Sequence, residues 1–169
     1  MSDRPLSRRA RTAVCAALVA WVALLAVVLL APSSAGPDWV ISHLAEALRR
    51  LGLPEVLAHP GRVESMLNVV AFVPLGLLGS LLWTRPTWRD WTAVGFVVSF
   101  AVEVVQAVAL GARQATNGDV VANTLGMLVG ALLGLLVTRI LSSRARRASE
   151  RGADLPDRQS PTEELEPPR

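Results

Sequence analysis

The feature that most constrains how this chain can fold is a run of apolar residues without a single charge, residues 13–31 (AVCAALVAWVALLAVVLLA). As a helix rising about 1.5 Å per residue, this run would be roughly 28 Å long, close to the thickness of the hydrocarbon core of a bilayer. Further apolar blocks cover residues 66–83, 91–110 and 120–141, and hydrophobic residues make up 51% of the 169-residue chain. We therefore expect an all-α integral membrane protein, a bundle of four transmembrane helices joined by short loops.

The first apolar block has a second interpretation, as a cleaved signal peptide. Arg8 and Arg9 precede it, and Ser33-Ser34-Ala35 resembles a small-residue cleavage site. The block is longer than the apolar region of an ordinary signal peptide, which favours a retained helix. The cleaved alternative stays open at this point.

Arginine residues are concentrated in segments that a four-span topology places on one side of the membrane. They occur in the N-terminus (residues 1–12), in the loop 84–90 and in the tail after residue 141. The loop 32–65 holds only three arginines in 34 residues, and the loop 111–119 holds one. By the positive-inside rule, both termini and the loop 84–90 are cytoplasmic, and the other two loops face outwards. The expected location is the plasma membrane, with both termini in the cytoplasm.

Two segments outside the spans have patterns of their own. In the first outer loop, Asp38 is placed to cap a helix in which Leu44 and Leu48 share a face, and Gly52 is placed to end it. This pattern predicts a helix lying on the membrane surface. The tail is polar, charged and rich in proline, and we expect it to be disordered. The expected divisions are therefore a basic N-terminus (1–12), a membrane domain (13–141) and a disordered cytoplasmic tail (142–169).

A set of amide and charged residues in and beside the apolar blocks falls at the ends that we expect on the outer side. They are Asn68, Glu103, Gln106, Arg113, Asp119 and Asn123. Glu103 lies about 10 Å below the end of its span, where an unpaired charge is costly, so we expect it to be paired with Arg113 or protonated. The sequence predicts a polar cluster at the outer leaflet.

Small residues and one proline indicate how the helices pack. Pro74 lies in the middle of its span, where it removes the hydrogen bond to the Val70 carbonyl, so we expect a kink and a substitute donor from a neighbouring helix. Spacings of four residues in the last span predict a close-packing ridge. The residues assigned to helix packing are Pro74, Gly76, Gly126, Gly130 and Gly134.

The order and spacing of these residues resemble those of a known family. Asn68, Phe72, Pro74, Leu75 and Gly76 form N-x-x-x-F-x-P-L-G, which resembles the second-helix motif of the VanZ-like family. The motifs that follow are similar to its signature, and they consist of Ser99, Glu103, Gln106, Arg113, Asp119, Asn123, Gly126 and Gly130. The resemblance covers about residues 64–138. It implies a small bacterial multipass membrane protein whose namesake is associated with resistance to the glycopeptide teicoplanin, and it implies no reaction.

The polar cluster is compatible with several functions. We favour a cell-envelope role, in which the cluster binds a lipid headgroup, a cell-wall precursor or a glycopeptide, with Arg113 as the anion contact. The alternatives are an intramembrane enzyme with Glu103 as acid/base, a transporter subunit, and a structural protein whose polar residues only hold helices together. We expect membrane lipids as partners and no nucleic acid, metal or cofactor, because no basic patch, Cys-His cluster or phosphate loop is present. Homo-oligomerisation is left open.

Overall fold

The computed structural model of the protein describes residues 6–29, 35–109 and 117–153, and those residues form helices and short connections without a strand. In chain order the helices are α1 (Arg8–Leu29), α2 (Ala35–Arg50), α3 (Glu55–Ala58), α4 (Pro60–Leu82), α5 (Trp88–Ala109) and α6 (Asn117–Ala153). Within the described part of the chain, α1, α4, α5 and α6 are long and apolar enough to cross a membrane. The predicted fold class, an all-α membrane protein with four spans, is confirmed.

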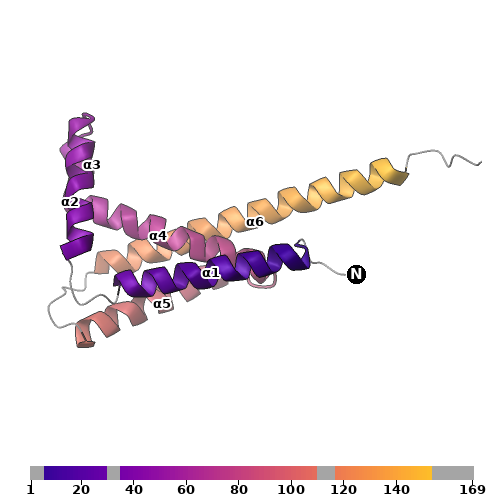
Figure 1. Ribbon diagram of the computed structural model, residues 1–169, viewed down its shortest axis with the longest axis horizontal. Coiled ribbons are helices and arrows are strands. Elements are labelled where there is room, and N and C mark those ends of the chain that lie inside the picture. The colour runs from indigo at the N-terminus through magenta and orange to yellow at the C-terminus, as the bar shows by residue number, and fades with distance from the viewer. Residues whose placement is uncertain (1–5, 30–34, 110–116, 154–169) are drawn as a thin grey trace, which may run out of the picture.

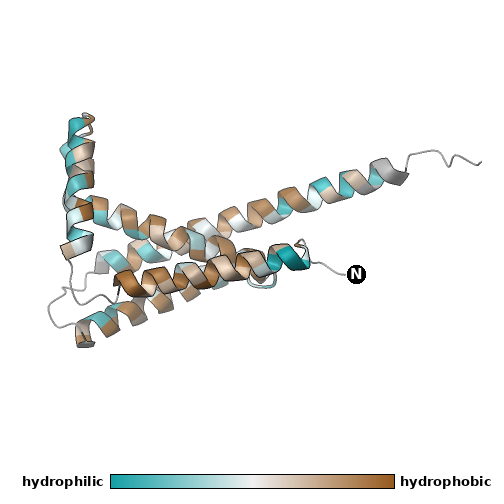
Figure 2. Cartoon of the chain, in the orientation of Figure 1, coloured by the Kyte–Doolittle hydropathy of each residue, from teal (hydrophilic) through white to brown (hydrophobic). Residues whose placement is uncertain are grey.

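The four long helices run alongside one another, and α6 packs against both α4 and α5 (Figure 1). The N-terminal end of α1, the connection between α4 and α5, and the C-terminal end of α6 lie at one end of the bundle. The pair α2 and α3 lies at the other end and crosses the long helices steeply. Apolar residues dominate the bundle, whereas α2 and the far end of α6 are mixed or hydrophilic (Figure 2). This arrangement agrees with antiparallel spans whose polar ends project beyond a bilayer.

Glycine residues bring α6 and α4 into backbone contact. A Cβ built on Gly126 would overlap the carbonyl oxygen of Val69, and one built on Gly130 would overlap that of Val73. One further turn along α6, a Cβ built on Gly134 would overlap the side-chain hydroxyl of Ser80 and approach the carbonyl oxygen of Leu77. Only a residue without a side chain fits at such positions, and close approach of this kind is how membrane helices gain van der Waals contact.

The two sides of this contact interlock, because α4 also contributes a glycine. A Cβ on Gly76 would overlap the backbone of Met127. The side chains of Phe72, Leu75 and Met127 are buried next to this contact, together with Leu25 of α1. The apolar core therefore lies where α1, α4 and α6 meet.

The turn between α4 and α5 is fixed by a capping box at the start of α5. Thr87 donates from both its backbone N–H and its hydroxyl to the Asp90 carboxylate, at 2.7 and 2.8 Å. The Asp90 N–H donates back to the Thr87 hydroxyl at 3.4 Å. These reciprocal bonds satisfy backbone donors that have no partner inside the helix. They explain why α5 begins at Trp88, slightly before the apolar block itself.

The first outer loop contains a helix, α2, where the sequence predicts one, but it begins at Ala35, so Asp38 lies in its first turn and does not cap it. Gly52 follows it with a φ of 79°, a conformation that glycine adopts at no steric cost. Arg50 and Arg49 donate to Glu46 at 3.0 and 2.8 Å, and both interactions hold the pKa of Glu46 below its ordinary value. Arg49 also reaches Glu55 of α3 at 3.3 Å, which links the two short helices. Their position on a membrane surface stays a prediction.

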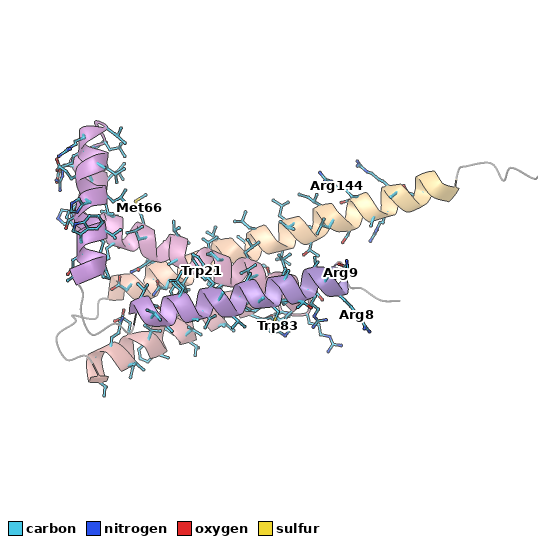
Figure 3. All side chains as sticks on the ribbon, viewed as in Figure 1. Arg8, Arg9, Trp21, Met66, Trp83 and Arg144 are labelled. Carbon is cyan, nitrogen blue, oxygen red and sulfur yellow. The ribbon has the colours of Figure 1, made fainter. Side chains whose placement is uncertain are left out.

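The prediction of a disordered tail beginning at residue 142 is wrong for residues 142–153. There α6 continues as a helix to Ala153. The segment contains arginine, alanine and serine and no proline, and an existing helix extends through good helix formers at one hydrogen bond per added residue. The hydrophilic extension carries Arg144 beyond the apolar bundle (Figure 3). Residues 154–169 of the predicted tail lie outside the described residues.

A hydrogen bond from α1 lies next to the proline of α4. Pro74 lies inside α4 and provides no N–H for the Val70 carbonyl. On the same turn, the Trp21 indole Nε1 of α1 donates to the Ala71 carbonyl oxygen at 2.9 Å (Figure 3). A neighbouring helix thus supplies a donor beside the proline. The donor bonds to the Ala71 carbonyl, however, and not to the Val70 carbonyl that the sequence analysis predicts. In lipid, such a donor is valuable because no water can replace it.

We expect Trp21→Phe to lower the free energy of unfolding by about 1 kcal/mol, because the ring volume is largely kept while the donor to Ala71 is lost. The measurement is an unfolding titration in mixed micelles followed by circular dichroism. Trp39→Phe is the matched control, since Trp39 is exposed and its ring lies tilted against that of His43. Equal effects of the two substitutions would show that the Trp21 bond contributes nothing.

Candidate functional site

The candidate site is a cavity of about 780 Å³ at the end of the bundle where α2 crosses it. Its walls are mostly apolar and include Leu24 and Val28 of α1, Val40 of α2 and Val70 of α4. Its polar lining comes from α4, α5 and α6 and consists of Glu64, Asn68, Glu103, Gln106, Asp119 and Asn123. The cavity is therefore amphipathic, with an apolar part and a polar part formed by different helices.

The polar lining includes all but one of the residues that the sequence assigns to the outer polar cluster. Asn68, Glu103, Gln106, Asp119 and Asn123 come together around this one cavity. Arg113 lies outside the described residues, so its predicted role as an anion contact stays a prediction. Pro74 and the packing glycines are not part of the lining and lie further along the helices.

Each amide of the lining ties two helices together through its NH₂ group. Asn68 of α4 donates to the Asp119 carboxylate of α6 at 2.7 Å. Asn123 of α6 donates to the Ser99 hydroxyl of α5 at 2.9 Å. Gln106 of α5 donates to the carbonyl oxygen of Leu29, near the end of α1, at 2.7 Å. Bonds of this kind hold membrane helices in register, which is the structural role that the sequence left open.

Glu103 differs from the amides of the lining. Its side chain is only 9% exposed, and within the described residues it has neither a hydrogen bond nor an ion pair. It shares the cavity lining with Asp119, a second carboxyl group. A carboxyl group contributes nothing to helix association unless it finds a donor, and its burial has a cost. Its pairing with Arg113 is not tested, because Arg113 lies outside the described residues.

The side-chain oxygen of Asn123 is a second acceptor of this kind. The residue is 4% exposed, and its Oδ1 atom is buried without a hydrogen-bond partner among the described residues. Buried polar atoms of native proteins nearly always have a partner. This oxygen and the Glu103 carboxylate belong to the same cavity wall. Both are acceptors that a bound molecule would satisfy.

Sequence reasoning missed the part of the site that is contributed by α1 and α2. Gln106 bonds to the end of α1, and the indole of Trp21 belongs to the cavity wall. Backbone carbonyls such as that of Leu29 leave no signal in a sequence. Glu64 had a usable signal: it precedes Asn68 by one helical turn, so it lies on the same face of α4.

The described part of the lining consists of apolar, amide and carboxyl residues. It contains no serine, threonine, cysteine, lysine, arginine or histidine. Among the described residues, no group of His, Cys, Asp and Glu side chains is arranged to hold a metal ion. Carboxyl groups and amide oxygens are acceptors and acid/base groups, so what the described residues offer is binding and proton transfer.

Comparison with known proteins gives one family. The family described as VanZ/LLP1 matches residues 17–138, well over half of the chain. No curated protein and no solved structure matches the chain significantly. The matched segment begins earlier than the resemblance at about residue 64 and includes α1 from residue 17 onwards and all of α2. Every described residue that lines the cavity lies within it.

Proposed function

Because this chain belongs to the VanZ/LLP1 family and is a membrane protein with four potential spans, we propose that it is a cell-envelope protein that binds an amphipathic molecule at the outer end of its bundle. The bound molecule is an envelope lipid or a lipid-linked precursor. The observation that carries this proposal is the cavity of about 780 Å³ with its apolar walls and polar lining. Sites for small molecules are typically concave, about 300–1,000 Å³ in volume and mostly apolar, with a few converging polar groups.

The position of the cavity supports a lipid-like ligand. Much of its apolar wall comes from α1 and α4, which are long enough to span a bilayer, so an acyl chain there would leave one apolar environment for another. The polar lining would meet the headgroup at the level where a bilayer changes from hydrocarbon to water. The arginine distribution supports the outer side for this end, with both termini in the cytoplasm of a bacterial cell.

The cellular role that we propose for this binding is in the envelope, with glycopeptide resistance as one form of it. The support is family membership, since the namesake of the family is associated with teicoplanin resistance. The direct measurement is teicoplanin sensitivity of a strain that lacks the protein, with and without re-expression.

A second candidate is an intramembrane enzyme that uses Glu103 as acid/base. The observation in its favour is that Glu103 and Asp119 line the same cavity, which is the pairing that acid/base catalysis uses. Asp119 accepts a bond from Asn68, and the described lining supplies no hydroxyl, thiol or amine nucleophile. Overexpression followed by mass spectrometry of lipids and precursors distinguishes the two, because an enzyme changes their profile and a binding protein changes only what copurifies.

The binding proposal is tested by filling the cavity. We expect Val28→Trp to reduce the amount of copurified lipid at least about tenfold, because Val28 lines the cavity and indole is much larger than isopropyl. The measurement is native mass spectrometry of the protein released from mild detergent micelles. Val27→Trp is the matched control, since Val27 is the adjacent residue of the same helix, is 71% exposed and does not line the cavity.

The Val27→Trp protein is expected to retain its lipid. If both variants retain the same species in the same amount, the lipid lies on the outer surface of the bundle and the cavity is not its site. If both lose it, the substitution acts through α1 as a whole, and the assignment of the ligand to the cavity is wrong.

A further inference from the structure

We propose that the polar group recognised in this cavity is an uncharged hydroxyl, carried by a molecule with an apolar chain. This inference rests on the proposed binding function and adds the chemistry of the headgroup. It follows from two buried polar groups, those of Glu103 and Asn123, which the helix contacts leave with unused hydrogen-bonding atoms among the described residues.

The two groups lie close together in the fold. Ser99 and Glu103 are one turn apart on α5, so their side chains are neighbours, with Cβ atoms about 5–6 Å apart. Asn123 of α6 donates to the Ser99 hydroxyl at 2.9 Å. Glu103 therefore lies one helical turn from this bond, and Glu103 and Asn123 both line the cavity. A single small polar group bound there would contact both of them.

The atoms left over on these two residues define what such a group must offer. The Asn123 NH₂ group is used by Ser99, and its Oδ1 atom is buried without a partner among the described residues, so this oxygen needs a donor. Glu103 is only 9% exposed and forms no hydrogen bond within the described part of the chain. Its carboxyl group is expected to be in the acid form where no cation is paired with it, and the acid form needs an acceptor for its hydrogen.

A hydroxyl group meets both needs, whereas a charged group meets only one. A hydroxyl donates its hydrogen to the Asn123 oxygen, and its own oxygen accepts from the acid form of Glu103. An ionised phosphate or carboxylate offers acceptors and would leave the Asn123 oxygen without a donor. An ammonium group only donates, and it loses far more hydration than a hydroxyl does when it enters a mostly apolar cavity. The choice of a hydroxyl therefore does not depend on the net charge of the lining.

The size of the cavity indicates that the hydroxyl belongs to a larger molecule. A bound water would satisfy the same atoms, but a water takes up about 30 Å³. The cavity has a volume of about 780 Å³, and its walls include Leu24, Val28 and Val40. These walls suit an alkyl chain attached to the hydroxyl. A lipid alcohol or the sugar headgroup of a glycolipid would supply both parts.

The test compares molecules with one alkyl chain and different polar ends. The full-length protein is placed in nanodiscs of phosphatidylcholine, whose headgroup has no hydroxyl. It is mixed with 1-dodecanol, its methyl ether, dodecylamine or dodecyl phosphate at equal mole fraction in the bilayer, and binding is measured from the shift in melting temperature. We expect dodecanol to bind at least about tenfold more tightly than each of the other three.

The methyl ether is the sharpest of these comparisons, because it keeps the chain and the oxygen and lacks the hydrogen that the Asn123 oxygen would accept. Equal or tighter binding of the ether would overturn the inference. Equal or tighter binding of dodecylamine or dodecyl phosphate would overturn it as well, and for the phosphate the result would favour Arg113 as an anion contact.

Two substitutions at Glu103 separate hydrogen bonding from charge. Glu103→Gln keeps a donor and an acceptor at the same place without an ionisable group, and we expect dodecanol to bind within about threefold of its affinity for the wild type. Glu103→Leu has a side chain of similar size without polar atoms, and we expect binding of dodecanol to weaken at least about tenfold. If Glu103→Gln weakens binding as much as Glu103→Leu, the ligand recognises a charge, and the inference is wrong. It is also wrong if neither substitution changes the affinity.

The outcomes also separate this inference from the proposed function. If none of the probes binds, the cavity is not a site for amphiphiles, and the proposed function fails with the inference. If all bind with equal affinity, the function stands and the headgroup assignment alone fails. Where dodecanol is preferred, dodecyl glucoside identifies the source of the hydroxyl: tighter binding than that of dodecanol supports a glycolipid, and weaker binding supports a lipid alcohol.

Discussion

Gly130→Leu is expected to prevent accumulation of the folded protein in the membrane. A Cβ at this position already overlaps the carbonyl oxygen of Val73 and reaches the backbone nitrogen of Leu77, so there is no space for a leucine side chain. Backbone cannot move aside as the end of a flexible side chain can. The variant has to separate α4 from α6, which are the two helices that form the centre of the bundle.

The expected cost is large because the contact is extended. Overpacking in a core typically costs about 1–3 kcal/mol, and here the neighbouring positions Gly126 and Gly134 would lose their contacts with α4 as well. We therefore expect the free energy of unfolding to fall by more than about 3 kcal/mol, a large fraction of the total stability of a typical domain. The measurement is the amount of monodisperse protein extracted from membranes, by fluorescence-detected size-exclusion chromatography of a tagged chain.

The matched control is Gly61→Leu, the same change near the start of α4. A Cβ at Gly61 meets nothing nearer than the ring of His59 at 3.6 Å, and the position is exposed. This variant is expected to accumulate like the wild type. Normal accumulation of Gly130→Leu would mean that α4 and α6 do not pack as described.

The helix contact itself is a feature that sequence analysis is able to predict. Spacing of four residues among Gly126, Gly130 and Gly134 places all three on one face, and a face without side chains has no other use in an apolar helix. The spans are predicted for an equally simple reason, because the thickness of a bilayer sets how many uncharged apolar residues a crossing helix needs. Sequence patterns do not show which helix the ridge meets. That α4 is the partner follows only from the contacts with Val69 and Val73.

The extent of α6 was harder to predict than its position in the membrane. Hydropathy falls after Leu141, and a polar, arginine-rich segment is typical both of a disordered tail and of an exposed helix. Composition alone does not separate them. The difference lies in what precedes the segment, because a helix that is already formed has no nucleation cost to overcome.

The candidate site was predicted in part, and its other half depends on tertiary structure. Asn68, Glu103, Gln106, Asp119 and Asn123 were recognisable because polar residues inside apolar spans are rare and functional positions hold many of them. The apolar walls had no such signal: Leu24 and Val28 look like any lipid-facing residues of α1. Without those walls the polar residues form only a cluster, and the cavity defines the shape of the ligand that we propose.

Glu103→Leu is expected to abolish binding of the amphiphile while leaving the protein as stable as the wild type, or more stable by about 1–2 kcal/mol. The carboxyl group is buried and forms no bond within the described residues, so its removal breaks no described contact and avoids the cost of burying a polar group. Natural proteins retain destabilising groups at functional sites, and a gain in stability with loss of function is the usual result of removing them.

Asn68→Leu is the matched comparison, because Asn68 lines the same cavity but donates to Asp119 across the α4–α6 contact. Its replacement leaves the Asp119 carboxylate without that donor, and we expect the free energy of unfolding to fall by about 1–3 kcal/mol. Both values come from one unfolding titration in mixed micelles, with binding measured on the same preparations. If Glu103→Leu is destabilised as much as Asn68→Leu, the acid holds helices together as the amides do. We expect the free energy of unfolding to fall for Asn68→Leu and to stay the same or rise for Glu103→Leu. This difference separates a role in helix association from a role in binding, because removing a residue that holds helices together cannot increase stability.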